Sequence, residues 1–132
     1  MKFSVRYQLI VQKDCDRLLA EQTGVKAVVI ASADGFDLAS ASSGQLAPQK
    51  IAAMASSISA IGDVVSQEAD IGNASSITVK TEAGFMYISS LQVDGTDCIL
   101  AVVCDESAVL ARVMLDCAEI RKRHKSLPRL VY

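Results

Sequence analysis

The sequence predicts an α/β fold of the α+β type, in which helices cover both faces of a five-stranded antiparallel sheet. Two apolar, β-branched runs with almost no alternation, residues 25–32 (VKAVVIAS) and 98–104 (CILAVVC), predict strands that are covered on both faces. Short turn signals containing Gly separate consecutive strand-like runs, and short hairpin turns make neighbouring strands antiparallel. We therefore expect one domain over residues 1–132, with its core at about 7–125 and its elements in the order α-β-β-α-β-β-β-α.

Residue patterns place the first four elements. Apolar residues three and four apart predict a first helix; they are Leu9, Ile10, Cys15, Leu18 and Leu19. After the buried strand at 25–32, residues 36–42 (FDLASAS) alternate as a half-exposed strand does. Pro48 suits the first turn of a long second helix, expected over residues 48–69, because the N–H that proline lacks would have no helical partner there.

The remaining pattern predicts three strands and a last helix. Residues 75–81 (SSITVKT) and 85–91 (FMYISSL) precede the apolar strand at 98–104, and apolar residues at helical spacing follow it: Val109, Leu110, Val113, Met114, Cys117 and Ile120. The two unbroken apolar strands belong in the middle of the sheet and the half-polar strands outside. Across the sheet, the expected order is therefore 36–42, 25–32, 98–104, 85–91 and 75–81.

Composition and charge exclude several classes of protein. The formal net charge of -2 and the pI near 5.3 give the chain no overall attraction for nucleic acid. No run approaches the roughly 18 apolar residues of a membrane-spanning helix, so we expect no membrane insertion and a cytoplasmic location. Four cysteines without CxxC spacing predict buried thiols and no metal site.

Catalytic and cofactor motifs are missing from the sequence. There is no GxxxxGK[ST] loop to hold a nucleotide, and the single histidine, His124, lies in a basic segment far from any candidate nucleophile. Asp34 and Asp94 each precede a glycine, which is typical of hairpin turns. We therefore expect no catalytic residues, no cofactor and no enzyme activity of the chain itself.

The second helix is too apolar to pack against a single partner. One stripe of mostly large residues suits the sheet: Ile51, Met54, Ala55, Ile58, Ile61, Gly62 and Val65. A neighbouring small-residue stripe, Ala53, Ser57, Ala60 and Val64, has the spacing of a contact between two helices. Ala52 and the remaining small polar residues are expected on the outer side. The alternative interpretation is that a loop covers the small-residue stripe, or that the stripe is ordinary helix surface.

The strand at 75–81 strengthens the first interpretation. It is expected at an edge of the sheet, short and flat, with only Lys80 to guard it, and Ser76, Thr78 and Lys80 are its candidate dimer-interface residues. Helix and edge together would form an isologous two-fold contact between two copies. We therefore predict a homodimer.

A basic cluster ends the chain, at 121–132, and its candidate partner-docking residues are Arg121, Arg123 and Lys125. Cations near the C-terminus of a helix stabilise it through the helix dipole, which is the structural interpretation. Docking of an acidic or phosphate-bearing partner is the functional one.

These stretches resemble the Roadblock/LC7 family. The likeness is carried by residues 24–40 (GVKAVVIASADGFDLAS), by the Ala/Ser/Ile-rich helix at 51–69, and by residues 75–123, and it covers nearly the whole chain. The resemblance implies dimerisation through the central helix and the third strand into a continuous ten-stranded sheet. It also implies a role as a regulator or scaffold of a small Ras-like GTPase, with a GTPase-activating effect in some bacterial members.

Two other functions stay open at this point. A structural adaptor or light-chain-type module would tether proteins without changing GTP turnover. A ligand-sensing domain of profilin-like shape would need a polar-lined pocket, which this Ala/Val/Ile-rich sequence does not indicate.

Overall fold

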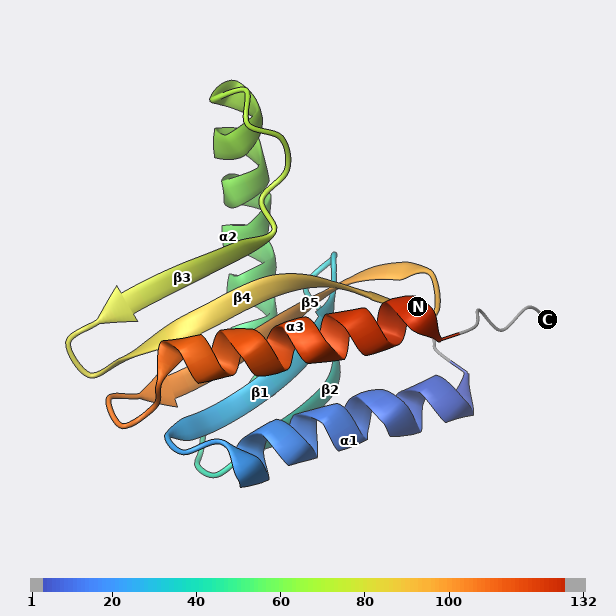
Figure 1. Ribbon diagram of the computed structural model, residues 1–132, viewed down its shortest axis with the longest axis vertical. Helices are drawn as coiled ribbons and strands as arrows, with labels where there is room; N and C mark the ends of the chain where they lie inside the picture. Colours follow the sequence, from blue (N-terminus) through green and yellow to red (C-terminus); the bar gives the residue numbers. More distant parts are fainter. Residues whose placement is uncertain (1–3, 128–132) are drawn as a thin grey trace.

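A computed structural model describes residues 4–127, and within that range three helices and five strands follow the predicted order (Figure 1). The elements are α1 (Val5–Glu21), β1 (Val25–Ser32), β2 (Asp37–Ser42), α2 (Pro48–Glu68), β3 (Ser76–Thr81), β4 (Gly84–Val93), β5 (Thr96–Asp105) and α3 (Leu110–Ser126). Pro48 opens α2 as expected, and the side chain of Ser4 caps α1 by accepting a hydrogen bond from the Tyr7 N–H at 3.3 Å.

The sheet has the strand order β2-β1-β5-β4-β3, which confirms the predicted arrangement. Every neighbouring pair is antiparallel. The apolar strands β1 and β5 lie centrally and pair from Val25 to Ser32 of β1, with a register shift between Val25 and Ala27 and with Ile30 opposite Leu100. The β3 strand pairs only with β4, so its outer edge is open in the described part of the chain.

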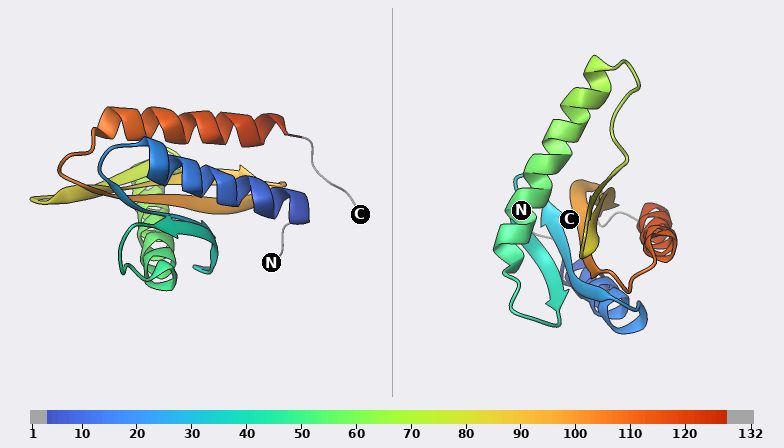
Figure 2. Two further views of the ribbon diagram at one scale, coloured as in Figure 1. Left: turned by 90° about the horizontal axis from the view of Figure 1, so that it is seen from below. Right: turned by 90° about the vertical axis from the view of Figure 1, so that its left-hand side faces the viewer.

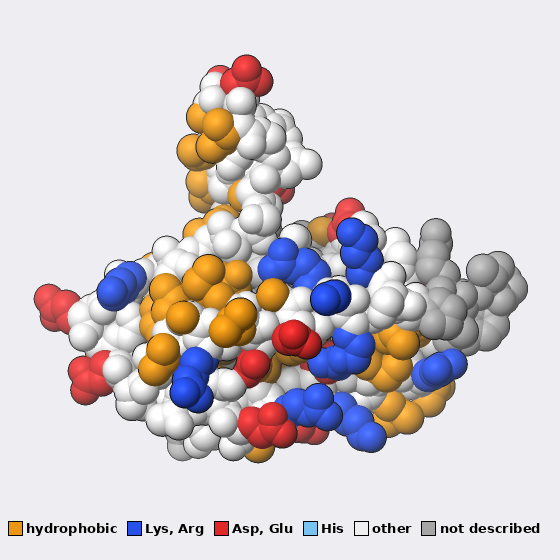
Figure 3. Space-filling view, viewed as in Figure 1, with side chains coloured by type: hydrophobic (Ala, Val, Ile, Leu, Met, Phe, Trp, Pro, Cys, Tyr) orange, Lys and Arg blue, Asp and Glu red, His pale blue; other side chains and the backbone are white. Residues whose placement is uncertain are grey.

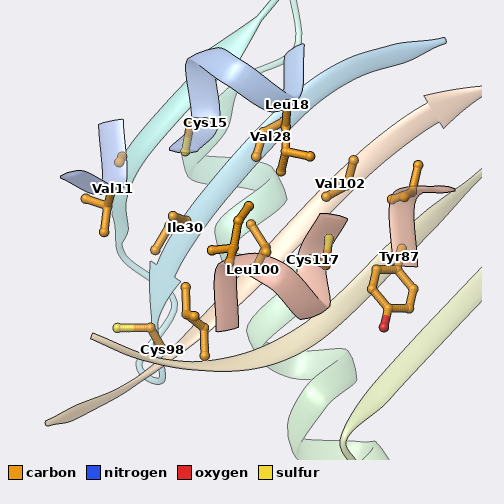
Figure 4. Close-up of a cluster of buried hydrophobic side chains, with 14 of the residues drawn as sticks. Val11, Cys15, Leu18, Val28, Ile30, Tyr87, Cys98, Leu100, Val102 and Cys117 are labelled. Carbon is orange, nitrogen blue, oxygen red and sulfur yellow. The ribbon is translucent and has the colours of Figure 1, made fainter. Parts of the chain in front are cut away.

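Helices cover the sheet unequally. Helices α1 and α3 lie side by side on one face, and α2 crosses the other face (Figure 2). The larger core lies under α1 and α3, where Val11, Cys15 and Cys117 pack onto Val28 and Leu100 (Figure 4). A smaller core under α2 joins Ile51, Ala52 and Ala55 to the opposite side of β1, β4 and β5.

The position of α2 corrects the expected packing of this helix. Ile51, Ala52 and Ala55 are buried, whereas Met54, Ile61 and Val65, which we assigned to the sheet, are 52%, 63% and 61% exposed. Ala52, which we expected on the outer side, has no exposed surface. The N-terminal turns of α2 therefore rest on the sheet, the helix crosses β3 near Gly62, and its last turns project past β3 (Figures 1 and 2).

Helix length explains this projection. A helix of 21 residues is about 31 Å long at ~1.5 Å per residue. Five strands spaced at ~4.8 Å span only about 19 Å from first to last. A helix that starts over β1 and β2 and crosses the strands must therefore run beyond the edge of the sheet, and we call the projecting part, residues 61–68, the overhang.

Candidate pairing surface

The overhang exposes three large aliphatic side chains on one side of the helix. Ile61, Val64 and Val65 lie three and four residues apart, so they share one side of the helix, and each is more than 60% exposed. Figure 3 shows hydrophobic side chains gathered along one side of the projecting helix. Three large aliphatic residues in water on one helical stripe are typical of a protein–protein contact.

The open edge of β3 lies directly below the overhang. Gly62 lets the two elements approach, because a Cβ at this position would lie 2.5 Å from Cδ1 of Ile77. Val79 has the same orientation as Ile77 by strand alternation and is 39% exposed beside the helix. The overhang and the β3 edge thus form one continuous surface. The overhang contributes apolar side chains to this surface, and β3 contributes backbone groups that have no strand partner on that side.

The small-residue stripe is exposed in a single copy of the chain. Ala53, Ser57, Ala60 and Val64 are all exposed on α2. The Ser57 hydroxyl donates to the Ala53 carbonyl at 3.0 Å, so the stripe is less polar than its sequence indicates. Sequence reasoning missed Ile61 and Val65, which belong to this surface and not to the core.

The three predicted β3 residues lie at the open edge through their backbone, and their side chains point elsewhere. Ser76, Thr78 and Lys80 are exposed, and alternation turns their side chains to the face opposite Ile77 and Val79. Their backbone forms part of the open edge, while their side chains lie on the face that carries α1 and α3. Pairing along this edge would therefore depend on the backbone far more than on these three side chains.

The structure separates the three candidate docking residues. All lie in the last turns of α3, which extends to Ser126, and residues 128–132 of the predicted basic segment lie outside the described residues. Arg123 donates from Nη1 to Asp14 Oδ1 of α1 at 2.5 Å, and its side chain stays 40% exposed. Arg121 and Lys125 instead line a cleft on the other side of α3.

His124 is buried, which the sequence did not indicate. Its Nε2 lies 2.7 Å from Asp14 Oδ2, and both side chains are almost fully buried between α1 and α3. Burial by itself would raise the pKa of Asp14, but the hydrogen bonds with His124 and Arg123 outweigh burial and hold the pKa below its ordinary value of 3.8. Asp14 is therefore an ionised carboxylate that joins two helices.

Groups suited to metal binding or nucleophilic chemistry do not converge in residues 4–127. The four cysteines are free and buried, and burial raises the pKa of each thiol to about 12. No cluster of three His, Cys, Asp or Glu residues is placed to hold a metal ion in the described range. Within that range there is also no helix with the length and apolarity to cross a membrane.

These features define a small α+β domain with an open sheet edge beside an overhanging helix. The family model of the Roadblock/LC7 domain matches residues 11–103, well over half of the chain. The chain therefore belongs to the Roadblock/LC7 family. No curated protein sequence matches it.

Solved structures share the fold at low sequence identity. Myxococcus xanthus MglB is 17% identical with a TM-score of 0.82, and the alignment covers 100% of this chain and 99% of that one. A Roadblock/LC7 domain from Streptomyces avermitilis is 19% identical with a TM-score of 0.76, covering 86% and 93%. The gliding protein MglB from Thermus thermophilus is 16% identical with a TM-score of 0.75, covering 96% of both chains. At these identities the likeness shows the fold.

Proposed function

We propose that this chain is a homodimeric, non-catalytic regulator or scaffold of a small Ras-like GTPase. The observation that carries the first half is the overhang. The exposed aliphatic residues of the overhang, Ile61, Val64 and Val65, have no sheet beneath them in one copy of the chain. The open edge of β3 lies beside them. A second copy that pairs its β3 with this edge would place its own sheet under the overhang and cover both surfaces at once.

Two-fold symmetry supports this arrangement. Antiparallel pairing of β3 with a second β3 is self-complementary, so each copy would receive the overhang of the other. The small-residue stripe would then let two copies of α2 approach closely. One such contact would pair the open edge of β3 and cover both the aliphatic residues of the overhang and the small-residue stripe. No loop within residues 4–127 covers all three of these features.

Family membership supports the second half of the proposal. The resemblance to Roadblock/LC7 proteins implies regulation of Ras-like GTPases, and the fold matches two MglB structures over almost their whole length. A domain of this kind would act through a surface it presents to the GTPase, and the nucleotide would be held by the partner. A cytoplasmic location is consistent with such a partner.

The test measures GTP hydrolysis by the Ras-like GTPase encoded nearest to the gene of this protein. We expect the dimer to bind the GTP-loaded form and to change its single-turnover hydrolysis rate. Binding without any change in rate would assign the adaptor function instead. Absence of binding to both the GDP and the GTP forms would contradict the GTPase proposal.

A further inference from the structure

The β2 strand forms the second edge of the sheet. In the described chain β2 pairs only with β1, just as β3 pairs only with β4 at the other edge. An edge strand with free backbone groups is a template on which another strand can add. The sheet of residues 4–127 therefore has two edges at which a second chain could pair, and the two edges differ in what covers them.

The outward side of β2 carries the backbone groups of Leu38 and Ser40. The Ser43 N–H bonds the Lys26 carbonyl of β1 at 3.0 Å, so this residue is turned toward β1. Backbone groups alternate between the two sides of a strand. Ser40 and Leu38, which lie an odd number of positions from Ser43, are therefore turned away from β1, and a further strand would pair with them.

Two glutamines of α1 occupy the carbonyl groups on this outward side. The Gln8 side-chain amide donates to the Leu38 carbonyl at 2.7 Å, and the Gln12 side-chain amide donates to the Ser40 carbonyl at 2.8 Å. A strand that added to β2 would have to donate its own N–H groups to these same carbonyls. The two side chains thus stand where the ladder of an added strand would begin.

The spacing of the two glutamines matches the spacing of the two carbonyls. Residues four apart rise about 6 Å along a helix, and residues two apart in an antiparallel strand lie about 6.8 Å apart. The Gln12 amide also donates to Asp16 Oδ1 at 3.1 Å, so both of its N–H groups are used and its direction is fixed. The contact is therefore a repeating arrangement between a helix and a strand edge.

The β3 edge has no cover of this kind. Within residues 4–127 no side chain hydrogen-bonds the backbone of β3 on the side away from β4. Two copies joined through β3 would form one sheet that ends in β2 on both sides. The state of the β2 edge then decides whether such a pair could add further copies.

We propose that Gln8 and Gln12 block the β2 edge and so limit self-association of this chain to the pairing made through β3. This inference rests on the homodimer of the proposed function. Without the two side chains, a pair of copies would present a pairing template at each end of its sheet. Contacts from β2 to β2 would then join pairs into larger assemblies.

The test measures the molar mass of Gln8→Ala/Gln12→Ala by light scattering on a sizing column, over a range of concentrations from micromolar upward. We expect at least about twice the mass of wild type, rising with concentration, because the unblocked β2 edges pair. Circular dichroism checks that the variant is folded. Gln12→Ala alone gives a second variant should the double variant fold poorly, and it should show the same direction of change.

Two further variants locate the new contact. Gln8→Lys/Gln12→Lys keeps a donor at both positions and adds charge to the edge, so it should have the mass of wild type. Ser40→Pro, added to the double alanine variant, removes the outward N–H of Ser40, a change that an edge strand tolerates. It should return the mass to that of wild type.

A structural role for the glutamines predicts a different result. If they only fasten α1 to the sheet, the double alanine variant would lose stability in urea and keep the mass of wild type, which would overturn the proposal. A larger assembly that persists after Ser40→Pro would overturn it as well, because the contact would then lie elsewhere.

The same measurement separates this inference from the homodimer. A monomeric wild type would contradict the homodimer, and the double alanine variant would still be expected to gain mass by pairing two single chains through β2. A dimeric wild type whose double alanine variant stays dimeric would leave the homodimer intact and contradict the blocked edge.

Discussion

Gly84 is a residue at which a single added methyl group would collide with the backbone of a neighbouring strand. A Cβ at this position would collide with the Cys104 carbonyl oxygen and lie 2.9 Å from the Asp105 Cα, which are backbone atoms of the paired strand β5. Because backbone cannot move aside as a side-chain tip can, the β4–β5 pairing itself would have to open. The close approach of the β5 backbone therefore requires glycine at the first position of β4.

We predict that Gly84→Ala lowers the free energy of unfolding by about 1–3 kcal/mol, the usual cost of inserting an atom into packed structure. Gly44→Ala is the matched control, because a Cβ there meets nothing within 4 Å, and its effect should stay within about 0.5 kcal/mol. Urea unfolding followed by circular dichroism measures both. A Gly84→Ala variant as stable as wild type would contradict the close approach.

The four cysteines offer a second measurement at the residue scale. All are buried, and burial raises the pKa of each thiol to about 12, so almost no thiolate exists at neutral pH. We predict that none of the four reacts promptly with Ellman's reagent in the native protein and that all four react once urea unfolds it. Rapid release of the chromophore from native protein would show that a thiol is exposed.

Among the elements, α1 and α3 are joined by one buried ionic contact. Asp14 binds His124 and Arg123, which lie 110 and 109 residues away in the sequence. Asp14→Ala would leave the buried His124 and the guanidinium of Arg123 without their acceptor. We predict a loss of about 2–4 kcal/mol in the free energy of unfolding, measured in urea at neutral pH. Asp16→Ala, two residues along and exposed, should cost under about 0.5 kcal/mol.

The pKa of Asp14 sets the pH dependence of this contact. Its value in the folded chain lies below the ordinary 3.8, so folding favours the ionised form. The contribution of Asp14 is therefore complete above pH 3.8 and is lost as the pH falls through the lower pKa of the folded protein. The stability gap between wild type and Asp14→Ala should shrink in that acid range. A gap that widens on acidification would contradict the assigned ionisation state.

Sequence reasoning was reliable for the strands and less so for the helices. The strand order was predictable because residues 25–32 and 98–104 are apolar on both faces, and burial on both faces requires a central place. The periodicity of α2 showed which residues share a side of the helix. It carried no information on where the helix leaves the sheet, so Ile61 and Val65 were assigned to the core. The contact between Asp14 and His124 was not predictable, since residues so far apart meet only through the fold.

At the scale of the whole molecule, the sequence predicted those parts of the candidate site that follow from the spacing of residues within one helix or one strand. Small residues at helical spacing indicated the stripe on α2, and an alternating, weakly guarded strand indicated the edge. The overhang needed the structure, because it arises from helix length compared with sheet width.

Pairing of two copies is the central claim, and it depends on the overhang, the stripe and the open edge acting together. Ala60 is exposed in the stripe, so an arginine at this position would place a charge between two closely approaching helices. The same substitution at Ala118, exposed on α3 and outside the proposed surface, introduces an equal charge where no copy is expected to bind.

The most direct test is the molar mass of the protein in solution, measured by light scattering on a sizing column at micromolar concentration. We predict that wild type and Ala118→Arg have twice the 14.0 kDa of one chain and that Ala60→Arg has the mass of a single, folded chain. A monomeric wild type, or an Ala60→Arg variant that stays dimeric, would contradict it.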